Sequence, residues 1–166
     1  IRPISASPRL TIVATARKVT PDEVAPAVQM LESWGLRVVL PDGLYDAENQ
    51  MAGSDSHRAA LLQRQLDDPD VRAIFCARGG YGTIRIVERL DFGRFCQSPK
   101  WIVGYSDITV LHSHIARHCG IATLHATMPL NVPADACRTA YPAIESLRQV
   151  LFEGKDMTGI PPYKRR

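Results

Sequence analysis

Short β-branched segments alternate with helix-length amphipathic segments along almost the whole chain, and this alternation constrains the fold more than any other feature. Consecutive parallel strands need crossover connections of helix length. We therefore expect an α/β fold, doubly wound, with a mainly parallel sheet and helices on both faces. The expected strands span residues 10–14, 36–40, 71–77, 101–105 and 121–124. The expected helices span residues 21–34, 55–66, 84–90, 107–119 and 141–152.

Two of these helices begin with residues that cap helix N-termini. Thr20 is the expected N-cap of the first helix, with Pro21 at the first helical position and Glu23 completing a capping box. Ser54 and Asp55 begin the second helix in the same manner. These starts predict well-defined helix N-termini.

Length and charge limit the domain count and the kinds of partner. The 166 residues suit one domain, so we expect the α/β domain to cover residues 1–154 and a tail or linker to cover 155–166. The net charge of +3 comes from residues 164–166, because the charges of the rest of the chain balance. We therefore expect no nucleic-acid partner. No apolar run approaches the roughly 18 residues of a membrane span, so we expect no membrane partner either.

The four cysteines are isolated from one another in the sequence. No two of them are spaced as C-x-x-C, so the spacing of a zinc ribbon is absent. We expect reduced, mostly buried thiols, as is typical of a cytoplasmic protein, and disulfides remain an alternative that no spacing supports. The cysteines are Cys76, Cys96, Cys119 and Cys137.

The sequence Gly104-Tyr105-Ser106-Asp107 lies between an expected strand and an expected helix. A serine at such a turn stands clear of the sheet, and the amide of Asp107 is then a free donor that can stabilise an oxyanion. Gly-x-Ser matches the start of a nucleophile elbow, although Ile108 replaces its last glycine. The alternative is that Ser106 or Asp107 only caps the helix.

Three glycines occur in the turn Arg78-Gly79-Gly80-Tyr81-Gly82. They indicate backbone that approaches another group closely or has a positive φ. Three hypotheses remain open: a phosphate cradle, a second oxyanion donor facing the serine, and a tight turn required by packing alone. Nucleotide binding is disfavoured, because an arginine replaces the third glycine of G-x-G-x-x-G and no P-loop lysine follows.

Taken together, residues 73–82 and 104–107 resemble the L,D-carboxypeptidase family of serine peptidases, which includes murein tetrapeptide carboxypeptidases and microcin-immunity peptidases. The resemblance extends over residues 9–152. Residues 14–17 depart from the proline- and serine-containing turn usual after the first strand, and residues 126–127 replace a common Gly-Pro. Both departures lie near the expected cleft, so they bear on substrate preference.

The resemblance implies a role for each site residue. Ser106 would be the nucleophile that attacks the amide before a terminal D-residue and forms an acyl-enzyme. The amides of Gly80 and Asp107 would form the oxyanion hole. The residues expected beside a murein-derived peptide are Arg78, Gly79 and Tyr81. The resemblance also implies a cytoplasmic role in peptidoglycan recycling, a homodimer as relatives often form, no metal and no organic cofactor.

In this family a glutamate and a histidine from a second, C-terminal domain activate the serine. Such a domain is absent from these 166 residues, so we expect the chain alone to hydrolyse little or nothing. The alternative enzyme is a microcin-immunity-type serine peptidase that cleaves an amide in a peptidyl-nucleotide. The alternative from another class is a non-catalytic peptide-binding α/β module.

The chain's own histidines are poor substitutes for that base. His112 lies six residues after the serine, about 9 Å of helix rise away, and His114 and His118 lie further along. His114 and His118 share a helix face, for which packing or solvation is a better explanation than zinc. His125, at a strand end, lies closer to the cleft, and His57 is expected on an exposed turn of its helix.

Overall fold

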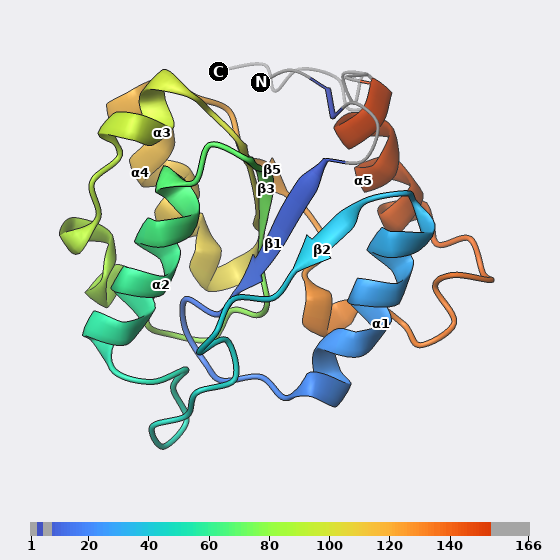
Figure 1. Cartoon of the computed structure of the whole chain (residues 1–166), viewed down its shortest axis with the longest axis horizontal. Coiled ribbons are helices and arrows are strands. Elements are labelled where there is room, and N and C mark those ends of the chain that lie inside the picture. Colours follow the sequence, from blue (N-terminus) through green and yellow to red (C-terminus); the bar gives the residue numbers. More distant parts are fainter. Residues whose placement is uncertain (1–2, 5–7, 154–166) are drawn as a thin grey trace, which may run out of the picture.

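The computed structural model describes residues 3–4 and 8–153 and confirms the expected α/β architecture. Five parallel strands form one sheet in the order β2-β1-β3-β4-β5 (Figure 1). The strands are β1 (Arg9–Val13), β2 (Arg37–Val39), β3 (Val71–Cys76), β4 (Trp101–Gly104) and β5 (Leu124–His125). The expected boundary at residues 154 and 155 lies outside the described residues.

Helices cover both faces of the sheet, as Figure 1 shows. One layer consists of α1 (Pro21–Ser33) and α5 (Pro142–Glu153), and the other of α2 (Asp55–Asp67), α3 (Gly93–Gln97) and α4 (Thr109–Cys119). Successive side chains of a strand point to opposite faces. Within β3, Ala73 and Phe75 accordingly pack in the core under α1 and α5, whereas Ile74 and Cys76 pack in the core under the other layer. The central strands are mostly apolar because both faces of the sheet are covered, and the exceptions in β1 and β3 are Arg9, Thr11 and Arg72.

The helix starts follow the capping signals. The Thr20 hydroxyl accepts the Glu23 N–H at 3.3 Å, and the Glu23 carboxylate accepts the Thr20 N–H at 2.9 Å. The Ser54 hydroxyl accepts the His57 N–H at 3.1 Å at the start of α2. The prediction of both N-caps is therefore confirmed.

Three expected elements differ from the structure. The helix expected at 84–90 is replaced by two short 3-10 turns, Thr83–Arg85 and Val87–Arg89. The helix expected at 107–119 begins with a 3-10 turn, Ser106–Ile108, before α4. β5 begins at Leu124 rather than residue 121, because only Leu124–His125 pairs with β4. The short helix α3 was not expected.

The expectation of reduced cysteines is wrong for two of the four. Cys96 on α3 and Cys119 at the end of α4 form a disulfide that joins two helices of one layer. Cys76 is buried and Cys137 is exposed, and both are free. Since disulfides persist mainly in oxidising compartments, the cysteine content no longer argues for a cytoplasmic location.

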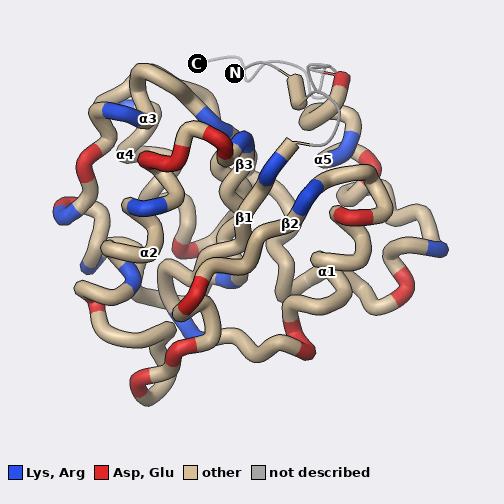
Figure 2. Tube along the Cα trace, in the orientation of Figure 1, with Lys and Arg blue, Asp and Glu red and all other residues tan. Residues whose placement is uncertain are grey.

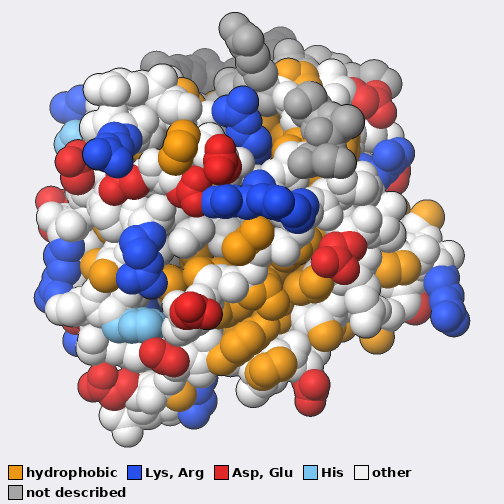
Figure 3. Space-filling model, viewed as in Figure 1, with side chains coloured by type: hydrophobic (Ala, Val, Ile, Leu, Met, Phe, Trp, Pro, Cys, Tyr) orange, Lys and Arg blue, Asp and Glu red, His pale blue; other side chains and the backbone are white. Residues whose placement is uncertain are grey.

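The face of the molecule seen in Figures 2 and 3 carries both signs of charge and an apolar region. Figure 2 shows basic and acidic residues interspersed over both helical layers. In Figure 3, hydrophobic side chains gather near the centre of the visible face, below β2, which is an edge strand of the sheet. Leu40, just after β2, is 38% exposed. No helix within the described ranges is both long enough and apolar enough to cross a membrane.

Candidate active site

The carboxyl ends of β1 and β3 lie side by side where the strand order reverses. From β1 the chain crosses through α1 to β2, on one side of β1, whereas β3 is followed by β4 on the other side. In open α/β sheets, ligands bind outside the strand ends at such a point. The turns after β1, β3 and β4 come together there.

Ser106 lies on the turn that follows β4. It is exposed, and its φ of 62° is left-handed, a conformation that costs a non-glycine residue of order 1 kcal/mol. A Cβ on Gly104 would lie only 2.9 Å from Cγ1 of Ile108, so the turn needs glycine there. Ile108, which replaces the last glycine of the elbow motif, thus packs against the first. A strained, exposed serine between a strand and a helical turn is the geometry of a nucleophile elbow.

The glycine turn approaches this serine from the end of β3. A Cβ on Gly79 would lie 3.2 Å from Ser106 Oγ and 3.3 Å from the Asp107 amide nitrogen. Gly80 and Gly82 have φ values of 121° and 140°, which side-chain-bearing residues rarely adopt. Both reasons for glycine, close approach and positive φ, therefore apply in this turn.

Two backbone N–H groups in these turns find no hydrogen-bond acceptor among the described residues. Within the part of the chain that the structure describes, neither the Gly80 N–H nor the Asp107 N–H donates a hydrogen bond. Gly79, the residue before Gly80, lies against Ser106. Unpaired donors next to a nucleophile are what an oxyanion requires.

The carboxylate of Asp107 ties the serine turn to the glycine turn. Its Oδ2 accepts the Thr83 N–H at 2.9 Å. The Thr83 hydroxyl lies 3.0 Å from the Thr15 hydroxyl, and both threonines are fully buried. Asp107 and the two threonines therefore link the turns that follow β4, β3 and β1.

A buried arginine supports the same turns from α2. Arg58 is 1% exposed, and its guanidinium donates to the carbonyl oxygens of Thr15 and Gly53 and to the Asp55 carboxylate. Arg85 also donates to Asp55, at 2.9 Å. Burial would raise the pKa of Asp55, but the hydrogen bonds from Arg85 and Arg58 outweigh burial and lower it. Asp55 thus stays ionised and Arg58 stays paired, which a buried charge requires.

The predicted substrate-binding side chains differ in how free they are. Tyr81 is 54% exposed. Arg78 Nη1 donates to the Lys18 carbonyl at 3.3 Å and lies 3.9 Å from the Glu23 carboxylate. Arg78 is therefore partly neutralised, whereas Tyr81 is free to contact a ligand.

The histidines nearest to the strand ends are engaged elsewhere. His112 Nε2 donates to the Gly104 carbonyl at 2.9 Å. Burial lowers the pKa of His112, against the effect of that hydrogen bond, and His125 lowers it further. The His125 ring lies 5.9 Å from the Tyr105 ring. Among the described residues, no hydrogen bond joins Ser106 to a histidine.

Other histidines serve packing. His57 is half-buried rather than exposed, and its Nε2 donates to the Gly43 carbonyl at 3.0 Å. The rings of His114 and His118 lie 4.4 Å apart, and His114 also packs 5.0 Å from Phe92. Residues 3–4 and 8–153 contain no group of three or more His, Cys, Asp or Glu side chains suited to a metal ion.

A family model described as the LD-carboxypeptidase N-terminal domain, Peptidase S66, matches residues 10–126 of this chain. The chain belongs to the peptidase S66 family. This confirms the resemblance drawn from the serine and glycine turns, both of which lie within the matched residues.

The curated relatives that this chain matches carry carboxypeptidase names, as two of them illustrate. A putative carboxypeptidase of Streptomyces coelicolor is 39% identical over 158 residues, which cover 92% of this chain and 50% of the relative. The murein tetrapeptide carboxypeptidase of Pseudomonas aeruginosa is 31% identical over 146 residues, 86% of this chain and 47% of that protein. The chain therefore spans about half the length of these relatives.

The S66 fold is also found in a solved structure. An MccF-like protein from Bacillus anthracis superposes with a TM-score of 0.79 at 22% identity, and the match covers 90% of this chain and 46% of the other. At this identity the likeness shows the fold alone.

Three contributors to the site were missed by the sequence reasoning: Thr15, Thr83 and Arg17. Thr15 and Arg17 lie in the turn after β1, and a Cβ on Gly80 would lie 2.8 Å from Arg17 Cδ. The available signal was the departure of residues 14–17 from the usual family turn, which marked the segment without assigning a role.

Proposed function

We propose that this chain carries the nucleophile and oxyanion donors of a serine L,D-carboxypeptidase acting on murein peptides. The observation that carries the proposal is the geometry around Ser106, which is exposed, has a left-handed backbone conformation and lies against the glycine turn. The N–H groups of Gly80 and Asp107 in these two turns donate no hydrogen bond within the described residues. Membership of the S66 family and the name of the P. aeruginosa relative support the reaction and the substrate class.

In the proposed reaction, Ser106 Oγ attacks the carbonyl carbon of the amide before the terminal D-residue, and its proton passes to a general base. The N–H groups of Gly80 and Asp107 donate hydrogen bonds to the oxyanion. The tetrahedral intermediate collapses, the C–N bond breaks, and the base returns the proton to the leaving amine. Water, deprotonated by the same base, then hydrolyses the ester on Ser106.

The general base belongs, in this proposal, to a second domain that supplies a glutamate and a histidine. His112 is already donating to the Gly104 carbonyl, and the described residues offer Ser106 no hydrogen-bonded histidine. The match to about half of each curated relative supports this division of the site. A homodimer and a cytoplasmic role in peptidoglycan recycling remain predictions from the resemblance.

The substrate is proposed to lie along the glycine turn. Tyr81 is exposed and available for contact with the peptide. Arg78, held by the Lys18 carbonyl and Glu23, and the Gly79 backbone form the floor beside it. A lack of side chains at positions 79 and 80 lets a peptide approach the N–H groups closely.

The test measures D-alanine release from an L,D-linked murein tetrapeptide. Two proteins are compared: this chain, and this chain joined to the remainder of the S. coelicolor relative that it does not match. We expect release by the joined protein, little by the chain alone, and none after Ser106→Ala. Equal release by the joined protein and its Ser106→Ala variant would overturn the proposal.

Two further arms separate the alternatives. A peptidyl-nucleotide offered in parallel tests the microcin-immunity-type reaction, which predicts that this substrate is hydrolysed faster than the tetrapeptide. Tetrapeptide binding without release from either protein indicates a non-catalytic peptide-binding module and contradicts the enzyme proposal.

A further inference from the structure

Arg17 is a cation at the candidate active site, and no acidic side chain among the described residues pairs with it. It follows β1, and its side chain is exposed. A Cβ on Gly80 would lie 2.8 Å from Arg17 Cδ, 2.9 Å from its Cγ and 3.0 Å from its Nε. The arginine stem therefore lies against the backbone of the glycine turn, which is possible only because residue 80 has no side chain.

The neighbouring arginines are neutralised, and Arg17 is not. Arg78 lies 3.9 Å from Glu23, and Arg85 lies 2.8 Å from Asp55. Within residues 3–4 and 8–153, Arg17 forms no ion pair and its side chain donates no hydrogen bond. Its guanidinium is thus the positive charge beside Gly80 that remains available to an incoming anion.

We propose that Arg17 binds the terminal carboxylate of the peptide substrate. This inference rests on the proposed function, because a carboxypeptidase must recognise the free carboxylate of the residue it releases. Arginine presents a planar fork of donors that matches a carboxylate in a bidentate manner.

The position of Arg17 suits that role. The scissile carbonyl and the terminal carboxylate belong to adjacent residues, whose Cα atoms are about 3.8 Å apart. The oxyanion is assigned to the Gly80 N–H, and the Arg17 stem and Nε pack against the same glycine. A substrate whose carbonyl oxygen reaches the Gly80 N–H therefore brings its carboxylate within reach of a long, flexible cation anchored next to it.

The turn that carries Arg17 is held by contacts with neighbouring segments. Thr15 is held through its hydroxyl by Thr83 and through its carbonyl by Arg58. Ala16 and Met51 crowd the position of a Cβ on Gly82, at 3.2 and 2.5 Å. These contacts fix the backbone from which Arg17 extends, so its side chain starts at a defined position beside the glycine turn.

The test measures binding of two probes to the chain by calorimetry. One probe is a tetrapeptide ending in D-alanine with a free carboxylate, and the other is the same peptide with a C-terminal amide. Arg17→Gln should raise the Kd for the free carboxylate by about 10-fold to 100-fold, the range expected for losing hydrogen bonds to a charged group, and change the Kd for the amide less than about twofold. Arg17→Lys should fall between the wild type and Arg17→Gln.

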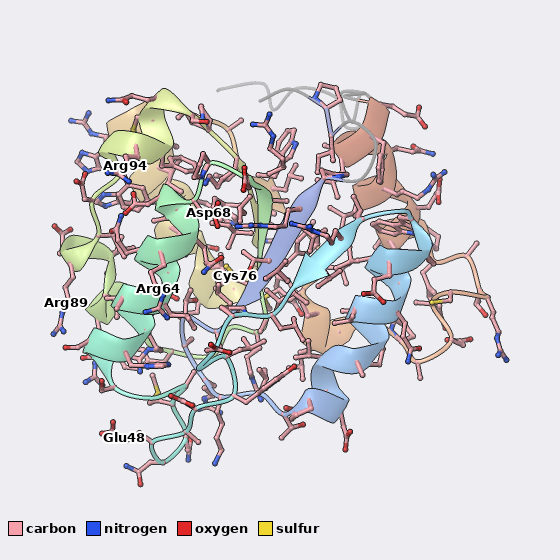
Figure 4. All side chains as sticks on the ribbon, in the orientation of Figure 1. Glu48, Arg64, Asp68, Cys76, Arg89 and Arg94 are labelled. Atoms are coloured by element: carbon pink, nitrogen blue, oxygen red, sulfur yellow. A yellow bond between two sulfur atoms is a disulfide. The ribbon has the colours of Figure 1, made fainter. Side chains whose placement is uncertain are left out.

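Arg94→Gln is the matched control, because it removes one exposed arginine from α3. Figure 4 shows Arg94 on the outer helical layer, away from the carboxyl ends of the strands. It should leave both Kd values unchanged. Equal losses for both probes after Arg17→Gln, or no loss for either, would overturn the inference.

The outcome is separable from that of the proposed function. If D-alanine release depends on Ser106 but Arg17→Gln does not weaken binding of the free carboxylate selectively, the proposed function stands and the inference about Arg17 is rejected. A carboxylate preference that depends on Arg17, without release from the joined protein, keeps the inference and rejects the enzyme.

Discussion

Gly79 and Ser106 are in van der Waals contact, such that a Cβ on Gly79 would come within 3.1 Å of Ser106 Cβ and 3.2 Å of its Oγ. The two residues follow β3 and β4, which pair in parallel with Ile74 opposite Ile102. The sheet register thus brings two turns, 27 positions apart in the printed chain, to one point. The absence of a side chain at position 79 lets the oxyanion donors and the nucleophile share that point.

Gly79→Ala tests this contact. The added methyl group must displace Ser106 by a few tenths of an ångström, and misplacement of a nucleophile by about 1 Å costs about 100-fold in rate. We expect D-alanine release by the joined protein to fall at least about tenfold, with the free energy of unfolding changed by less than about 1 kcal/mol.

Gly93→Ala is the control for Gly79→Ala, because its added Cβ meets the Asp91 carboxylate at 3.1 Å, a flexible side chain that can move. It should leave the rate unchanged. A Gly79→Ala variant with the wild-type rate would show that the contact does not position Ser106.

Ser106 stores backbone strain, which substitution can release. Its φ of 62° favours glycine over alanine, so Ser106→Gly should be more stable than Ser106→Ala by about 1 kcal/mol in urea unfolding. Ser113, exposed in α4, provides the matched pair. There alanine should be more stable than glycine by about 1 kcal/mol, because glycine is disfavoured inside a helix. The same order at both positions would contradict strain at Ser106.

Local signals predicted much of the fold. The capping box of α1 needed no tertiary information, since Thr20 and Glu23 are three residues apart. The helix expected at 84–90 failed because its apolar spacing did not correspond to one buried face. Ile84 is 53% exposed, whereas Ile86 is buried. The Cys96–Cys119 disulfide could not be foreseen, because it depends on how the unexpected helix α3 packs against α4.

The candidate site divides in the same way. The serine and glycine turns follow directly from short motifs, because each motif is one continuous segment. Thr15 and Thr83 are 68 positions apart in the chain. Arg17 and Gly80, which also lie against each other, are similarly distant in sequence. Such contacts exist only after β1 and β3 have paired, so no local pattern predicts them.

Asp107→Ala removes the acceptor of the Thr83 N–H. Leaving that N–H without a partner should cost about 1–3 kcal/mol in unfolding free energy and slow D-alanine release, because the two turns lose their link. Asp107→Asn keeps an oxygen that can accept the same bond and should retain most of both properties. Equal damage from the two substitutions would show that the negative charge of Asp107, rather than its hydrogen bond, is what matters.

Lys100, which directly precedes β4, should make the free energy of unfolding depend on pH. Burial, together with the charges of Arg72 and Arg9, lowers its pKa to about 8 against the opposing effect of Asp67. Its ammonium donates to the carbonyl oxygens of Gln65 and Asp68, at 3.0 and 2.5 Å. Between this pKa and the ordinary value of 10.5, the unfolded chain binds more protons at Lys100 than the folded chain does.

The unfolding free energy should therefore rise with pH across that window, by up to about 3 kcal/mol relative to Lys100→Met, in which the titrating group is absent. Urea unfolding of both proteins at several values from pH 7 to 11 measures this difference, and taking the difference cancels the contributions of other groups. Lys18→Met, at an exposed lysine, is the control and should parallel the wild type. A difference between wild type and Lys100→Met that stays constant with pH would show that Lys100 keeps its ordinary pKa, and that its two carbonyl partners compensate the burial of its charge.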